Sequence, residues 1–321
     1  MERTGIFLAI AVAICWGSAD TTATFASRRL GTFTTTMISL LVSVVTLILF
    51  ALLFSAPLSL SLTLPALLAS APIGLLSGVM AAIGYFSLYR GLELGPVAIV
   101  SPVVAADGAF AAVLAIPLLH ERVSPWQVGL LLCIFCGIFF ASTDLTELRE
   151  LLGAAASASL LKGGPRWGLL AMAAFGIMLF SIGASAQSSG WFLPILWTRC
   201  FAALTLAAFG LWQHYRFARI SSTSLSASPS SADAGAIKPS LLSIGLVLAT
   251  GVGLFETTGL LVYSIATQLA ATGLAAAISS SFGLIPLLVG LTFLRERPKA
   301  HQLVGVALVT IGLVLLAMKP M

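Results

Sequence analysis

The sequence predicts an all-α integral membrane protein with ten transmembrane helices. Three observations lead to this prediction: 59% of the 321 residues are hydrophobic, only 8% are charged, and the mean hydropathy is +1.08. A soluble domain typically carries about 25% charged residues, so the composition excludes a soluble enzyme, a disordered chain and an ordinary nucleic-acid-binding domain. The basic residues behind the net charge of +5 are scattered, so no nucleic-acid partner is expected.

Ten apolar segments account for the helices. In chain order they cover residues 5–25, 33–54, 67–89, 97–119, 125–142, 167–187, 192–212, 241–265, 271–294 and 300–318. A helix needs roughly 20 residues to cross about 30 Å of hydrocarbon, and each segment approaches or exceeds that length. None alternates with a period of two residues, so each is expected to be a helix that satisfies its own backbone groups in lipid.

Two polar stretches interrupt the series of apolar segments. Residues 143–166 are predicted to link a first unit at 1–142 to a second unit at 167–321. Residues 213–240 contain a simple run of Ser, Ala and Pro that offers little to pack. We therefore expect a loop over 213–240 inside the second unit.

The two units resemble each other in sequence. Glu121 and Glu296 follow the fourth and ninth segments, 175 positions apart, and each precedes an arginine. The same spacing relates Leu94 to Leu269, Gly108 to Gly283, Gln127 to Gln302 and Gly137 to Gly312, and Trp16-Gly17 corresponds to Phe175-Gly176. Because five is odd, two five-helix repeats enter the membrane from opposite sides, which predicts inverted repeats around a central cavity.

Charged side chains within the apolar segments are candidate functional residues, because they are costly in a bilayer. Asp107, Glu256 and Asp20 are candidates for proton coupling. Arg199 is a candidate to bind a substrate carboxylate or to balance the acids. A structural ion pair between Arg199 and one acid, with Asp20 reaching the interface, is the competing interpretation, and both stay open.

Aromatic and amide side chains within the segments are candidates to bind a substrate, since ligand pockets combine apolar walls with a few polar groups. The candidates are Trp16, Tyr85, Tyr89, Gln187 and Tyr263. Tyr85 and Tyr89 lie four residues apart on one helical face, a spacing that also fits ordinary packing. Cys133 and Cys136 form a C-x-x-C, but they lie in an apolar segment with no other ligand nearby, which is more typical of packing. No pair of histidines has metal-ligand spacing, so neither a metal nor a cofactor is expected.

These motifs resemble the EamA family of the drug/metabolite transporter superfamily. The residues that carry the resemblance are Trp16-Gly17, the run from Gly91 to Ala98, Glu121-Arg122 with Gln127 and Gly129, and Glu296-Arg297 with Gln302 and Gly305. Arg199 fits a position early in the second helix of a repeat, where the family often carries arginine. The resemblance implies two EamA repeats, a ten-helix basket with a central cavity, and transport by alternating access.

The function implied by the resemblance is secondary transport of a small organic solute, with export as the favoured direction. The solute is an amino acid, another metabolite or a drug-like compound. The protein is then not an enzyme but a multi-pass protein of the cell membrane, whose partners are the solute, membrane lipid and, if transport is proton-coupled, protons.

Two other functions were weighed against transport. An intramembrane lipid-modifying enzyme needs clustered histidines, paired acids or a nucleophile with its base, yet His120, His214 and His301 lie in loops or at segment ends. A non-transporting membrane subunit fits poorly with duplicated halves and charges inside the spans.

The orientation in the membrane stays open. Loops after odd-numbered segments hold 12 Lys and Arg residues, and the opposite side holds 3. The positive-inside rule therefore places the termini outside the cytoplasm, whereas the resemblance implies cytoplasmic termini. The sequence also leaves the oligomeric state open.

Overall fold

The structure is a computed structural model that describes residues 2–54, 63–94, 97–118, 124–142, 164–223, 239–293 and 299–318. All regular structure in these ranges is helical. The first half contains α1 (Glu2–Leu30), α2 (Thr32–Phe54), α3 (Leu64–Leu94), α4 (Val97–Val104), α5 (Asp107–Leu118) and α6 (Pro125–Ser142). The second half contains α8 (Gly164–Ser189), α9 (Leu193–Thr223), α10 (Pro239–Leu269), α11 (Thr272–Ser279), the 3-10 helix η1 (Ser280–Gly283), α12 (Leu284–Thr292) and α13 (Ala300–Met318).

The helices have the length and surface of membrane spans. Within the described ranges, seven candidate spans are found: α1, α2, α3, α8, α9, α10 and the segment Thr272–Val289. Large apolar side chains such as Leu52 and Phe293 face outward, with 74% and 82% of their surface exposed. An outer surface of this kind suits lipid, where every backbone group must be paired within the helices. The chain is a multi-pass all-α membrane protein.

Two of the predicted apolar segments contain interrupted helices. The segment 97–119 divides into α4 and α5 at Ala105 and Ala106, where the Ala106 N–H donates to the carbonyl of Val103 in a tightened turn. The segment 271–294 divides at η1 into α11 and α12. Hydropathy does not reveal these breaks, because both segments stay apolar on average in spite of Asp107 in the first and the serines at 279–281 in the second.

The boundaries of the two polar stretches also differ from the prediction. The predicted boundaries of the loop at 213–240 are wrong, because α9 continues to Thr223 and α10 begins at Pro239. Polar residues end an apolar segment without ending a helix, and the stretch that follows Trp212 contains neither Gly nor Pro as far as Thr223. The remainder, 224–238, lies outside the described residues. The predicted linker 143–166 is also outside them, except for the start of α8 at Gly164.

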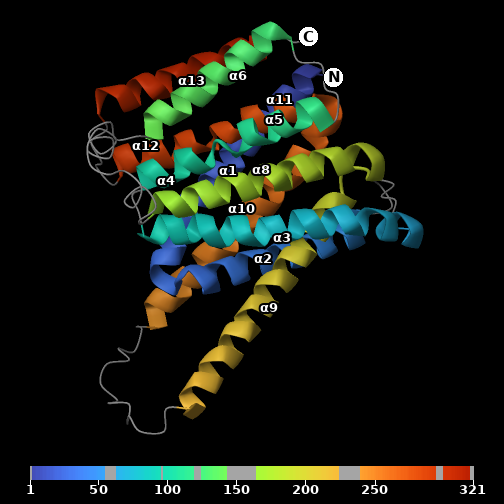
Figure 1. Ribbon diagram of the computed structural model, residues 1–321, viewed down its shortest axis with the longest axis vertical. Helices are drawn as coiled ribbons and strands as arrows, with labels where there is room; N and C mark the ends of the chain where they lie inside the picture. The colour runs from blue at the N-terminus through green and yellow to red at the C-terminus, as the bar shows by residue number, and fades with distance from the viewer. Residues whose placement is uncertain are drawn as a thin grey trace.

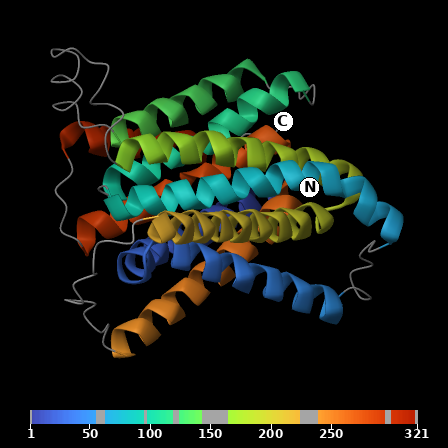
Figure 2. The same cartoon turned by 60° about the horizontal axis from the view of Figure 1, so that its bottom comes forward.

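Helices from the two halves of the sequence pack against each other in pairs. In one pair α1 packs along α10. In another pair α3 packs along α8, and Figure 2 shows these two helices side by side. The contacts are close because glycines face rings: Gly84 of α3 faces Phe175, and Gly259 of α10 faces Trp16. Small residues allow this approach between membrane helices. The paired helices α6 and α13 lie along one edge of the molecule (Figure 1).

Candidate functional site

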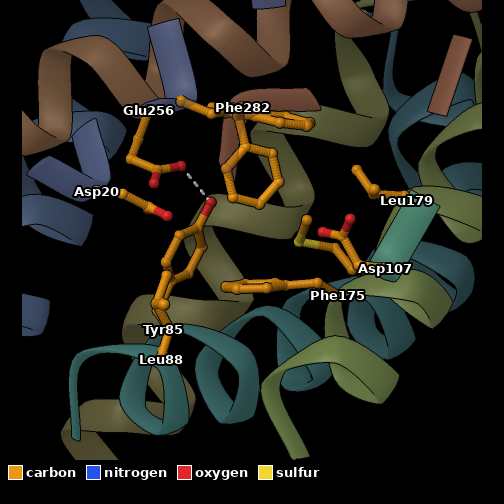
Figure 3. Close-up of a pocket in the computed structure, with 10 residues that line it drawn as sticks. Asp20, Tyr85, Leu88, Asp107, Phe175, Leu179, Glu256 and Phe282 are labelled. Atoms are coloured by element: carbon orange, nitrogen blue, oxygen red, sulfur yellow. Dashed lines mark hydrogen bonds between the residues drawn. The ribbon is translucent and has the colours of Figure 1, made fainter. Parts of the chain in front are cut away.

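A small cavity lies where α1, α3, α5, α8, α10 and η1 meet. Three carboxyl groups line it: Asp20 from α1, Asp107 from the start of α5 and Glu256 from α10. All three residues are almost fully buried, with exposed fractions of 2%, 3% and 4%. In Figure 3, Asp20 and Glu256 lie on one side of the cavity and Asp107 on the other, with Phe175 and Phe282 between them.

Glu256 belongs to a buried cluster with two other side chains. The Tyr85 hydroxyl of α3 donates to its carboxylate at 2.5 Å, drawn as the dashed line in Figure 3. The Arg199 guanidinium of α9 donates to the same carboxylate oxygen at 3.3 Å. The guanidinium carbon also lies 4.8 Å from the centroid of the Tyr85 ring, a cation–π distance. The charge of Glu256 is therefore balanced by a cation that three helices hold in place.

Asp20 and Asp107 have a different kind of partner. The Ser101 hydroxyl of α4 donates to Asp20 at 3.1 Å, and the Ser280 hydroxyl of η1 donates to Asp107 at 2.8 Å. In the described ranges neither carboxyl group forms a salt bridge. The donors lie in or beside the interrupted helices, so the breaks bring hydroxyl groups to the acids. No group of three His, Cys, Asp or Glu side chains in the described chain is placed to hold a metal ion.

Aromatic rings form much of the wall. Trp16 lies 5.7 Å from Tyr263 and 6.0 Å from Phe282, and Tyr85 lies 4.8 Å from Phe175, all between ring centroids. Distances of 4.5–7 Å are typical of favourable aromatic pairs. The Trp16 side chain lines the cavity, and its buried indole N–H has no hydrogen-bond partner among the described residues.

The structure brings five of the nine predicted site residues together at the cavity: Trp16, Asp20, Tyr85, Asp107 and Glu256. The other four lie around it. Arg199 lies behind Tyr85 and Glu256, and Tyr89 packs beside Tyr85 with a ring distance of 6.0 Å. The Tyr263 hydroxyl donates to the carbonyl of Leu179. Gln187 is in α8, and its side chain lies outside the described residues.

Several apolar lining residues were not predicted, because an apolar side chain in an apolar segment gives no signal by itself. They are Leu88, Phe175, Met178, Leu179 and Phe282. The repeat spacing provides a usable signal for three of them. Phe282 follows Asp107 by 175 positions, and Leu179 follows Asp20 by the 159 positions that separate Trp16 from Phe175. Asp20 and Asp107 thus each have an apolar counterpart in the other half.

Comparisons with known proteins agree with the membrane fold. Residues 3–143 match the model of the EamA-like transporter family, which confirms the resemblance predicted from the sequence. No curated protein matches the chain significantly. Among solved structures, 26 chains match. One of them, titled only "Crystal structure of protein", has 18% sequence identity and a TM-score of 0.62, and the match covers 99% of this chain and 98% of that one. At this identity the likeness shows a shared fold.

Proposed function

We propose that this protein, whose first half matches the EamA-like transporter family, is a secondary transporter of small organic solutes in the cell membrane. The observation that carries the proposal is the central cavity, which both halves line and beside which two helices are interrupted. Ionisable groups within a membrane protein mark solute and ion pathways. Interrupted helices form the solute site in many secondary transporters.

The proposed inverted repeats are supported by matching contacts in the two halves. Gly17 of α1 lies against the carbonyl of Phe282, and Gly176 of α8 lies against the carbonyl of Asp107. The two carbonyls are 175 positions apart, as are the helix breaks that begin at Ala105 and Ser280. The first helix of each half thus packs on the interrupted helix of the other half. This reciprocal packing supports the proposed repeats at 1–142 and 167–321, joined by the linker 143–166.

The chain crosses the membrane ten times if each interrupted helix is counted as one span. The fourth span is then α4 with α5, the ninth is α11 to α12, and α6 and α13 are the fifth and tenth. The two ends of the chain lie on the same side of the molecule (Figure 1), as an even number of crossings requires. In this account the two halves rock around the cavity, giving alternating access and net export.

The proposed solute is an amino acid, another metabolite or a drug-like compound. Trp16 and Tyr85 contact it directly, since both line the cavity. Tyr89, Tyr263 and Arg199 support that wall from behind, and Gln187 belongs to the same helix as Phe175 and Leu179.

Proton coupling is proposed for Asp107 and Glu256, with Asp20 as the third acid of the cavity. Glu256 faces Arg199 and Tyr85, whereas Asp20 and Asp107 face serine hydroxyls. A carboxyl group that takes up a proton on one side and releases it on the other ties solute movement to the pH gradient. Replacing the carboxyl groups by amides keeps their shape and removes the titration.

The proposal is tested with purified protein in proteoliposomes under an imposed pH gradient. The double variant Asp107→Asn with Glu256→Gln is expected to lose proton-driven accumulation of the solute. Glu93→Gln is the matched control, because Glu93 pairs with Arg90 at the end of α3, away from the cavity. Unchanged accumulation in the double variant rejects the proton role.

A further inference from the structure

The charges around the cavity are unbalanced. Its lining includes three carboxyl groups and, among the described residues, no Lys, Arg or His side chain. Among the described residues, the cation that contacts these acids is Arg199, which donates to Glu256 and lies against the ring of Tyr85. Within the described ranges the donors to these two carboxyl groups are neutral: the Ser101 hydroxyl for Asp20, and the Ser280 hydroxyl and the Gly108 backbone N–H for Asp107.

Buried carboxylates of this kind call for a positive partner. An ionised group in an apolar interior is costly unless it is paired or takes up a proton, and the ionised forms of Asp20 and Asp107 lack a cation among the described residues. The surrounding rings of Trp16, Tyr85, Phe175 and Phe282 also favour a cation, since the face of an aromatic ring attracts positive charge. These groups together complement a positively charged solute with an apolar body.

A second feature also indicates a ligand. The Trp16 side chain is 94% buried and lines the cavity, yet its indole N–H lacks a hydrogen-bond partner within the described chain. Buried indole N–H groups usually have a partner. A hydroxyl or carbonyl oxygen on the solute supplies one. A carboxylate is a poorer choice, because it meets three acids and no uncommitted cation.

We propose that the solute is a protonated organic amine with an apolar or aromatic body and no free carboxylate. This inference rests on the proposed transport function and narrows its substrate class. The ammonium group pairs with Asp20 or Asp107, and the body lies between Phe175 and Phe282, which separate these acids in Figure 3. Amines are then favoured over the amino acids that have the same side chains.

The test uses amines and their parent amino acids, which differ only in the carboxylate. Tyramine is compared with tyrosine, tryptamine with tryptophan, and isoamylamine with leucine. Binding is measured by the thermal shift of the purified full-length protein, and transport by counterflow in proteoliposomes. We expect at least one amine to be exchanged in counterflow and to bind about tenfold or more tightly than its parent amino acid. A tenfold difference in affinity corresponds to about 1.4 kcal/mol of binding free energy. The neutral N-acetyltyramine is expected to bind as weakly as tyrosine.

Variants connect this selectivity to the cavity. Asp20→Asn and Asp107→Asn are each expected to weaken amine binding about tenfold. Glu93→Gln, the same change at a carboxyl group outside the cavity, is expected to leave binding unchanged. A preference for the parent amino acids, or wild-type amine binding in the Asp20→Asn, Asp107→Asn double variant, overturns the inference. If other solutes are transported and no amine is, the substrate class alone is wrong; if no solute of any class moves, the transport function fails as well.

Discussion

At the scale of single residues, one ion pair explains why a guanidinium can remain inside the bundle. Arg199 is 1% exposed, and its contacts are the carboxylate of Glu256 and the ring of Tyr85. Removing one member of a buried pair leaves an uncompensated charge, whereas replacing both members is often tolerated. Arg199 and Glu256 therefore depend on each other, and this dependence is measurable.

The ion pair predicts a strongly non-additive double-mutant cycle. Arg199→Met alone is expected to lower the free energy of unfolding by about 3–5 kcal/mol, because Glu256 is left buried beside Tyr85 without its cation. The double variant Arg199→Met with Glu256→Gln is expected to recover much of this loss. Thermal unfolding of the four proteins in detergent checks the prediction. A double variant as unstable as the sum of the two single changes contradicts the pairing.

At the scale of helices, close packing depends on glycines that face rings across the boundary between the two halves. A Cβ atom at Gly84 meets the Phe175 ring, and one at Gly259 meets the Trp16 indole. Both rings also line the cavity. The glycine positions therefore control the helix spacing and the shape of the cavity together.

Gly84→Ala and Gly259→Ala are expected to destabilise the protein by about 1–3 kcal/mol, the usual cost of overpacking a core. Gly129→Ala is the matched control, since a Cβ atom there meets nothing within 4 Å. That control is expected to be neutral or slightly stabilising, because alanine favours the helix. Thermal unfolding of the three variants gives the comparison. Equal stability of all three contradicts the packing account.

The helices also show what the sequence predicts well and what it misses. Hydropathy locates the spans closely: the segment 125–142 matches α6, and 300–318 matches α13. It misses the breaks at Ala105 and Ser280, because a helix break depends on local backbone hydrogen bonds and tertiary contacts that leave composition unchanged. It also ends α9 too early, since polarity marks the edge of the hydrocarbon layer rather than the end of the helix.

The site residues that the sequence predicts best are the charged residues within apolar segments. Asp20, Asp107 and Glu256 attract notice because charge inside an apolar segment is costly, and all three line the cavity. Phe175 and Leu179 are as apolar as the residues around them in the segment 167–187, so only the fold or the repeat spacing identifies them as cavity residues. The turns that contain Glu121 and Glu296 lie outside the described residues.

At the scale of the whole molecule, the proposed transport depends on one cavity that both halves line. Helices α1, α3 and α5 supply one part of its wall, and α8, α10 and η1 supply the other. In the proposed mechanism, rocking of the halves changes the access to this cavity without rebuilding either half. A side chain that fills the cavity is therefore expected to stop transport, whereas the same side chain on the outer surface is not.

The most direct test is solute counterflow in proteoliposomes, comparing the wild type with Leu179→Trp and Leu204→Trp. Leu179 lines the cavity, and Leu204 of α9 is 63% exposed on the outer surface. Size-exclusion profiles and thermal unfolding first establish that both variants are folded. Labelled amines, amino acids and nucleosides serve as the solutes. If the cavity is the transport pathway, at least one solute moves in the wild type and in Leu204→Trp, and this flux is lost in Leu179→Trp. No flux in the wild type, or equal flux in a folded Leu179→Trp protein, contradicts it.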